Sequence, residues 1–222
     1  MSNVRQIYCL LAIYNLRLLI SYLFQQLFFI NSVHAGGSGV GTAATQLATE
    51  SGCRVFVTAG TTEKIEKCKE LGATDGANYK TDEWDVKIKD LAGDRGVNAV
   101  LDCIGGSYWK QNANVLSQDG RWTLYGLMGG PKVDGNILAM LLRKRLRLEA
   151  TTLRSRSLEY KKDLTKRFSE HALDLFRSGR YQVILDQKSF SLEEAQASHD
   201  YMETNKNIGK IILKVSEEEH NL

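Results

Sequence analysis

The stretch HAGGSGVG at residues 34–41 joins an apolar run that ends at Val33 to a helical period over residues 42–51. A loop with so few side chains lets backbone N–H groups approach a phosphate closely, and the helix after it carries roughly half a positive charge at its N-terminus. The glycine spacing differs from the common GxGxxG pattern, so a merely tight turn is the alternative. The strand-to-helix setting favours a phosphate-binding loop.

Short β-branched or aromatic runs alternate with helical periods along the chain from this loop onward. This alternation is typical of a parallel sheet with helices on its faces. It predicts an α/β fold, a Rossmann-type doubly wound parallel sheet. The expected strands are residues 28–33, 54–58, 77–79, 97–102, 121–125 and 146–153, and the expected helices are residues 42–51, 63–71, 82–91, 108–116, 137–143 and 160–177.

The pattern changes after Gly179. Residues 183–190 and 209–215 are expected to be extended and residues 192–204 helical, but no glycine turn follows each strand. These short elements are interpreted as part of another sheet, followed by an acidic tail.

The composition is that of a folded globular protein. Of the 222 residues, 43% are hydrophobic and 25% are charged, with a single proline, which excludes collagenous, low-complexity and disordered classes. The net charge of +3 is too small to indicate a nucleic-acid-binding protein. Cys9, Cys53, Cys68 and Cys103 form no CxxC pair, which favours a reducing compartment, and we expect the protein to be cytoplasmic.

Residues 7–30 form an apolar segment unlike the rest of the chain. Its length is close to the ~20 residues that span a bilayer, but Arg17 interrupts it, and a central arginine costs about 2.5–3.5 kcal/mol on insertion scales. A membrane anchor and a secretory signal cleaved before Gly36 are two interpretations. We favour a third, in which residues 28–33 form the first strand and the residues before them form an apolar helix.

The end of the second strand indicates which dinucleotide the fold would bind. A carboxylate there would accept hydrogen bonds from the ribose 2′-OH of NAD, but residues 58–61 read TAGT. Lys64 follows one helical turn later and Tyr79 ends a nearby strand, and a cation with hydroxyl groups suits a 2′-phosphate. The pattern favours NADPH over NADH, and the alternative is that Lys64 is an ordinary solvated helix residue.

Two further loops, residues 102–107 and 125–129, follow strands of the predicted sheet. Ligands of open α/β sheets collect outside the carboxyl ends of the strands, so both loops are candidates to contact a ribose and a nicotinamide. One hypothesis makes Cys103 a nucleophile, but a small buried thiol is the commoner outcome, and we favour packing.

The histidines and one basic run carry less information. His34, His171, His199 and His220 show no HExxH or paired-ligand spacing, so no metal site is expected, and we assign no catalytic residue. His34 is expected to be a strand residue rather than a catalyst. The basic run at residues 143–147 lacks interleaved aromatic residues and is interpreted as a solvated corner rather than a nucleic-acid contact.

Five motifs carry a resemblance to a known family. They are HAGGSGVGTAATQLA from His34, LDCIGGSYW from Leu101, DGRWTLYGLMGG from Asp119, LRSR from Leu153 and YMETNKNIGKIIL from Tyr201. Together they closely resemble the zinc-independent quinone oxidoreductases of the medium-chain dehydrogenase/reductase superfamily, near zeta-crystallin. The resemblance covers residues 33–215.

The resemblance implies NADPH-dependent, metal-free reduction of quinones or related electrophilic alkenes, with the hydride passing directly from the nicotinamide to the acceptor. It also implies a homodimer built through the edge strand that residues 147–153 resemble. The cofactor-binding residues that it implies are Gly37, Ser38, Gly39, Val40 and Gly41 at the pyrophosphate, Thr61, Lys64 and Tyr79 at the 2′-phosphate, Cys103 along the cofactor, Gly126, Leu127 and Met128 at the nicotinamide, and Asn205 reaching back from the C-terminal segment.

These reductases begin with a GroES-like catalytic domain, which residues 1–31 do not resemble. The expected division is an apolar segment (1–31), a Rossmann domain (32–179), an incomplete piece of the GroES-like β domain (180–215) and an acidic tail (216–222). We therefore expect a truncated or alternatively spliced product, or a gene model that reads through non-coding sequence, with impaired activity. The alternatives are a non-catalytic remnant that binds nucleotide or dimerises, and a membrane-anchored protein.

Overall fold

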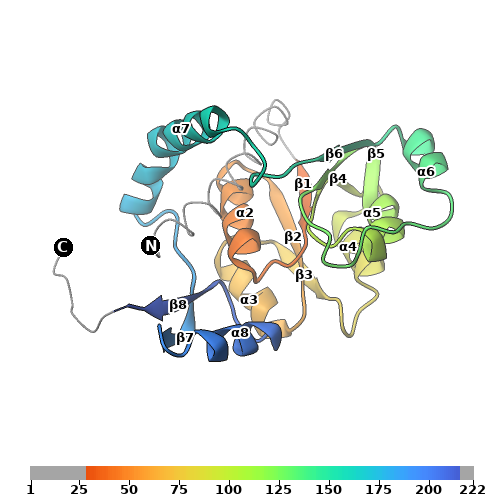
Figure 1. Cartoon of the computed structure of the whole chain (residues 1–222). Helices are drawn as coiled ribbons and strands as arrows, with labels where there is room; N and C mark the ends of the chain where they lie inside the picture. The colour runs from red at the N-terminus through yellow and green to blue at the C-terminus, as the bar shows by residue number, and fades with distance from the viewer. Residues whose placement is uncertain (1–28, 216–222) are drawn as a thin grey trace.

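A computed structural model describes residues 29–215, and at its centre is a six-stranded sheet (Figure 1). The strands lie in the order β3-β2-β1-β4-β5-β6, and every neighbouring pair is parallel. The chain thus builds the sheet outward from β1 in one direction and then, from β4, in the other. The bounds are β1 (Ile30–Val33), β2 (Arg54–Ala59), β3 (Asp75–Asn78), β4 (Val97–Asp102), β5 (Leu116–Leu124) and β6 (Arg147–Ala150).

Helices cover both faces of this sheet because alternate strand side chains point to opposite faces. Val55 and Val57 of β2 share one core cluster with Ala44 of α2, whereas Phe56 shares the other with Ile88 of α4. Figure 1 shows α2 and α3 on one side of the sheet and α4 and α5 on the other. The predicted doubly wound α/β fold is confirmed. The helices are α2 (Gly39–Glu50), α3 (Thr62–Glu70), α4 (Trp84–Ala92), the 3₁₀ turn η1 (Gly106–Tyr108), α5 (Trp109–Val115), α6 (Ile137–Lys144), α7 (Leu158–Arg177) and α8 (Ala195–Glu203).

Helix α2 begins three residues earlier than the sequence predicts. Ser38 has extended backbone angles, and its Oγ accepts a hydrogen bond from the Gly41 amide at 2.9 Å, which makes Ser38 the N-cap. Gly39, Val40 and Gly41 therefore form the first turn of the helix instead of a loop. The glycines hid this boundary, because glycine is a poor helix former in the interior but is tolerated in a capped first turn.

Strand β5 also starts earlier, at Leu116, although Asp119 and Gly120 predict a turn before Arg121. The register with β4 explains the difference, since Val97 pairs with Leu116 and Ala99 pairs with Arg121. The residues between these pairs bulge out of the ladder, and Asp119 has a positive φ of 59°. The turn signal is real, but it marks a bulge within the strand.

The C-terminal segment forms a second, two-stranded parallel sheet from β7 (Leu185–Ser191) and β8 (Lys210–Lys214), with α8 between them. Gln182 is tied to α2 by two hydrogen bonds with Gln46, at 2.7 and 3.1 Å. The Gly209 amide donates to the Gly37 carbonyl at 2.8 Å. The C-terminal segment thus packs directly on the glycine-rich loop.

Most of the apolar segment at residues 7–30, and the acidic tail from residue 216, lie outside the described residues. Residues 30–33 form the expected first strand. Within the described range 29–215, no helix combines the length and the apolar character needed to cross a membrane.

The basic run at residues 143–147, which begins in the last turn of α6, caps the end of another helix. Lys144 Nζ donates to the carbonyls of Ala113, Asn114 and Leu116 at 2.8, 2.9 and 2.7 Å, at the C-terminus of α5. A cation there satisfies carbonyls that have no partner within the helix. We expect Lys144→Met to lower the free energy of unfolding in urea by about 1–2 kcal/mol, because hydrogen bonds to a charged group are lost. The matched variant is Arg143→Met, at an exposed neighbouring position. Equal stability of the two variants would show that this cap contributes nothing.

Candidate functional site

The loops at the carboxyl edge of the sheet meet where the strand order reverses. The glycine-rich loop follows β1, and residues 103–107 follow β4, which is the neighbour of β1. In open α/β sheets this switch point is where ligands bind. The candidate residues fall into two groups, one on each side of it.

The glycine-rich loop forms the floor of the first group. The amides of Gly39 and Val40 lie in the first turn of α2, where amides have no partner within the helix, and Ser38 forms a parallel bridge with Gly209 beside them. A Cβ on Gly37 would lie 2.9 Å from Cδ of Lys64, so the lysine stem packs directly on the loop backbone. The loop thus exposes helix N-terminal donors beside a buried lysine, an arrangement that suits an anion.

Lys64, Asn205 and Tyr79 are brought together although they are far apart in the sequence. Lys64 Nζ donates to the backbone oxygen of Asn205 at 2.7 Å and to its Oδ1 at 3.1 Å, and Asn205 Nδ2 donates to the Tyr79 hydroxyl at 3.0 Å. Asn205 has φ of 54°, a left-handed conformation that asparagine adopts more readily than most residues. Three of the predicted site residues therefore form one hydrogen-bonded cluster.

The interpretation of Lys64 as a solvated helix residue is wrong, because only 5% of its surface is exposed. Burial, and then the nearby charge of Lys80, lower its pKa. Thr61 is close by as the N-cap of α3, where its Oγ1 accepts from the Lys64 amide at 3.3 Å. Because Lys64 is largely removed from solvent and lies near a second positive charge, an anion bound beside it would stabilise its charged form.

Two further lysines, Lys80 and Lys210, lie at this site although the sequence did not predict them as site residues. Lys80 lies near Lys64, and its Cε would be 3.3 Å from a Cβ placed on Gly60. The stem of Lys210 lies over Gly39, where it would overlap an added Cβ. Lys80 could have been found from its position beside Tyr79, but no local signal connects Lys210 with a loop 171 residues earlier (210 − 39).

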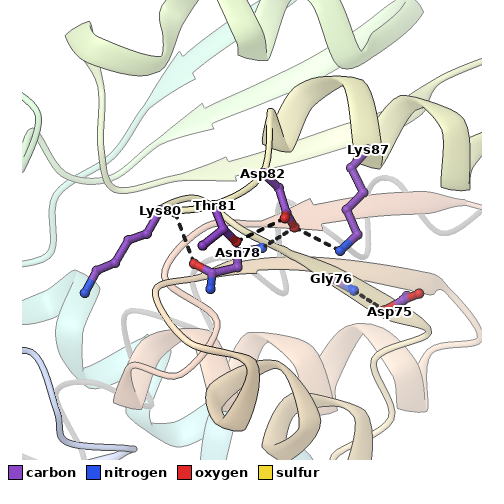
Figure 2. Close-up of polar contacts among 7 residues, drawn as sticks. All are labelled: Asp75, Gly76, Asn78, Lys80, Thr81, Asp82 and Lys87. Atoms are coloured by element: carbon purple, nitrogen blue, oxygen red, sulfur yellow. Dashed lines mark hydrogen bonds and ion pairs between the residues drawn. The ribbon is translucent and has the colours of Figure 1, made fainter.

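The turn that carries Tyr79 and Lys80 is held by Asp82 (Figure 2). Asp82 Oδ2 accepts from the Asn78 amide and from Lys87 Nζ, both at 2.9 Å. Asn78 Oδ1 in turn accepts from the Lys80 amide at 3.1 Å. The hydrogen bonds from Lys87 and then from the Asn78 amide hold the pKa of Asp82 below its ordinary value.

The lowered pKa of Asp82 predicts how the stability of the fold changes with pH. A carboxyl whose pKa is lower in the folded state stabilises it above the unfolded pKa of about 3.9, and that contribution is lost as the pH falls through the folded pKa. We expect Asp82→Asn to lower the unfolding free energy by less than about 1 kcal/mol at pH 7, with the difference from wild type shrinking below about pH 4. Asp90→Asn on the exposed face of α4 is the control for pH-dependent urea unfolding. A difference independent of pH would contradict this role.

The second group of candidates is formed by two loops that pair through their backbones. The Met128 amide donates to the Cys103 carbonyl at 3.0 Å, and the Gly129 amide donates to the Ile104 carbonyl at 2.7 Å. Gly126 must lack a side chain, since a Cβ would lie 2.8 Å from the Cys103 carbonyl oxygen. Leu127 and Met128 are 51% and 79% exposed, so this side of the edge presents an apolar surface.

Cys103 lies beneath these loops and is buried. Burial raises the pKa of its thiol to about 11, so it is protonated at neutral pH. A protonated, buried thiol is not an activated nucleophile. This favours the packing interpretation of Cys103.

The described residues do not fit a zinc ion. No cluster of three or more His, Cys, Asp or Glu side chains that could hold a metal occurs within residues 29–215. Burial also raises the pKa of the Cys68 thiol to about 12, whereas zinc binds the thiolate.

In the basic run at residues 143–147, Arg145 forms a bidentate pair with Asp119 at 2.8 Å, and Lys144 caps α5 as described above.

Comparisons with known proteins show which family the chain resembles. A family model described as "Zinc-binding dehydrogenase" matches residues 39–178. The chain is 25% identical over 181 residues to Quinone oxidoreductase 1 of Escherichia coli, covering 81% of this chain and 55% of that protein. It is 28% identical over 184 residues to a 2-haloacrylate reductase of a Burkholderia species, covering 82% and 54%.

A similar solved structure is that of Escherichia coli quinone oxidoreductase complexed with NADPH. It has a TM-score of 0.78 and 25% identity, and the match covers 94% of this chain and 63% of that one. The chain spans about half the length of the curated relatives it matches.

Proposed function

The chain belongs to the zinc-binding dehydrogenase family, and from this membership we propose that it binds NADPH and acts in the reduction of a quinone or related electrophilic alkene. The observation that carries the proposal is the cluster of Lys64, Tyr79 and Asn205 at the end of β2. No Asp or Glu occupies residues 58–61, where NAD-binding folds hold the ribose 2′-OH. A cation with a hydroxyl and an amide suits the 2′-phosphate instead.

We place the rest of the cofactor along the switch point of the sheet. The pyrophosphate would lie at Gly37 and Ser38 and at the first-turn amides of Gly39 and Val40, with Gly41 allowing the helix to approach the strand. The nicotinamide would lie on the other side, against Gly126, Leu127 and Met128 and along Cys103. The span from α2 to the loop after β5 crosses the reversal of strand order, as a dinucleotide does in this class of fold.

The bound cofactor would supply a hydride, and this chain's residues would bind and orient it. Leu127 and Met128 offer apolar surface that would exclude water from the nicotinamide ring. Cys103 keeps its proton and does not act as a base. The chemistry would therefore depend on positioning rather than on proton transfer by a side chain.

The activity is tested by measuring the reduction of a simple ortho-quinone, monitored as the loss of NADPH absorbance. Because the chain spans about half the length of its relatives, we expect turnover well below that of Escherichia coli Quinone oxidoreductase 1 assayed in parallel. Turnover equal to that relative would contradict this expectation. NADPH binding without any turnover would instead favour the second candidate, a non-catalytic nucleotide-binding protein.

We also propose that the protein forms a homodimer through β6. We retain the cytoplasmic location expected from the sequence as a proposal. Residues 147–150 form the edge of the sheet and are all exposed, and Leu148 in this strand is 43% exposed. An exposed edge strand is a template for pairing with another chain. We expect sedimentation to give twice the chain mass of 24.9 kDa and Leu148→Glu to give the monomer. A monomeric wild type at assay concentrations would contradict the proposal.

A further inference from the structure

A chain of buried polar groups runs beneath both halves of the candidate site. His34 is fully buried one residue beyond β1, and its Nδ1 lies 3.0 Å from Thr58 Oγ1. Its Nε2 lies 2.7 Å from Asn112 Oδ1. Asn112 Nδ2 reaches Asp102 Oδ2 at 3.0 Å, and all four side chains are fully buried. Buried polar groups are costly unless each is paired, and here each one is.

The donor and the acceptor of each hydrogen bond in this network can be assigned in turn, starting from Asp102. Asp102 Oδ2 also accepts from the indole Nε1 of Trp122 at 2.9 Å, and an indole can only donate. Because a charged Asp102 carboxylate can only accept, the group of Asn112 that faces it is the NH₂, and the amide oxygen of Asn112 faces His34. Nε2 of His34 then carries the hydrogen, and Nδ1 accepts from the Thr58 hydroxyl. The network specifies one tautomer of His34.

Three members of the network lie where loops of the candidate site begin, and Asn112 joins them from within α5. His34 directly precedes the glycine-rich loop, and Thr58 lies near the end of β2, just before Thr61. Asp102 ends β4, and its Oδ1 accepts from the amides of Ile104 and Gly105 at 2.7 and 3.0 Å. One hydrogen-bonded chain thus connects the loops on both sides of the switch point.

We propose that His34, fixed as the neutral Nε2–H tautomer by Asn112 and Thr58, is a positioning residue that sets the glycine-rich loop relative to the loop after β4, and so the affinity for the dinucleotide. The proposal rests on the proposed binding of NADPH. His34 is not proposed to contact the cofactor. It acts through the loops, because groups held by a fully paired shell keep their geometry.

The surroundings of the ring support a neutral imidazole. Trp84 and Tyr108 enclose it edge-on, with ring centroids at 4.8 and 5.1 Å. Burial lowers the pKa of His34, while the charge of Asp102 and the hydrogen bond to Asn112 act in the opposite direction. A proton on Nδ1 would also remove the only acceptor that faces the Thr58 hydroxyl in this network.

The test combines cofactor affinity with a direct measurement of the tautomer. We expect Thr58→Val to weaken NADPH binding about 10-fold, because Nδ1 loses its donor, and Thr58→Ser to bind within about 2-fold of wild type, because it restores the hydroxyl. Thr123→Val is the control, at a buried threonine of β5. Nitrogen NMR of the full chain, with the His34 signals assigned from His34→Gln, should show the proton on Nε2 at neutral pH.

Three results would overturn the inference. Wild-type affinity in Thr58→Val would show that the network does not set the site, and equal losses in Thr58→Val and Thr123→Val would show a general packing effect. A proton on Nδ1 in the wild type would contradict the ordering of donors, even if Thr58→Val fails to fold. These failures differ from failure of the proposed function, in which the wild type itself binds no NADPH.

Discussion

Replacing Lys64 with methionine is expected to weaken NADPH binding by about 10- to 100-fold and to leave NADH binding nearly unchanged. A charge-assisted hydrogen bond contributes about 1.5–3 kcal/mol, and each 1.4 kcal/mol is a factor of ten in affinity. Methionine keeps an apolar stem against Gly37, where Lys64 packs. The loss should therefore follow the charge and appear only with the cofactor that carries a 2′-phosphate.

The matched control for Lys64→Met is Lys67→Met, on the same helix. Lys67 pairs with Glu70 at 2.7 Å on the surface, and such exposed pairs contribute little to stability. Fluorescence titration with each cofactor gives the two dissociation constants. If the affinities for NADPH and NADH weaken equally, Lys64 acts through the fold. If the affinity for NADPH is unchanged, the 2′-phosphate does not bind at this cluster.

Gly41→Ala is expected to have the largest effect on stability, lowering the free energy of unfolding by about 3 kcal/mol or preventing folding. A Cβ at this position would overlap the carbonyl oxygen of Ala35 and lie 2.7 Å from Cα of Gly36. Both are backbone atoms, so neither can move without shifting α2 away from β1. The fully buried Ala44 and Ala48 on the same helix show how closely this helix packs on the sheet.

Gly39→Ala separates this steric effect from the general cost of replacing a glycine in the loop. The three atoms nearest to an added Cβ at Gly39 all belong to the stem of Lys210, which is flexible and can move aside. We expect this variant to lie within about 1 kcal/mol of wild type in urea unfolding monitored by circular dichroism. Equal stability of the two alanine variants would contradict the close contact between α2 and the Ala35 carbonyl.

The fold was predictable because its signals are local. Alternation of β-branched strands with helical periods, and glycine at the turns, reports on neighbours within a few residues. The two boundary errors arose where a local signal has two meanings. The glycines at residues 39–41 form a capped helical turn instead of a loop, and Asp119-Gly120 forms a bulge instead of a strand end.

The site was less predictable because its contacts are not local. Lys64 and Tyr79 followed from their places near strand ends, but the contact between Lys64 and Asn205 joins residues 141 apart, and only the family resemblance pointed to Asn205. The contact between His34 and Asn112 joins residues 78 apart, and nothing periodic marks either of them. Composition and spacing therefore located the loops of the site but not the polar groups that connect them.

Calorimetric titration of the 222-residue chain with NADPH and, separately, with NADH measures the cofactor preference of this site directly. The cluster of Lys64, Tyr79 and Asn205 predicts that NADPH binds at one site per chain and at least about 10-fold more tightly than NADH. Absence of binding by either cofactor, or NADH binding as tightly as NADPH, would contradict it.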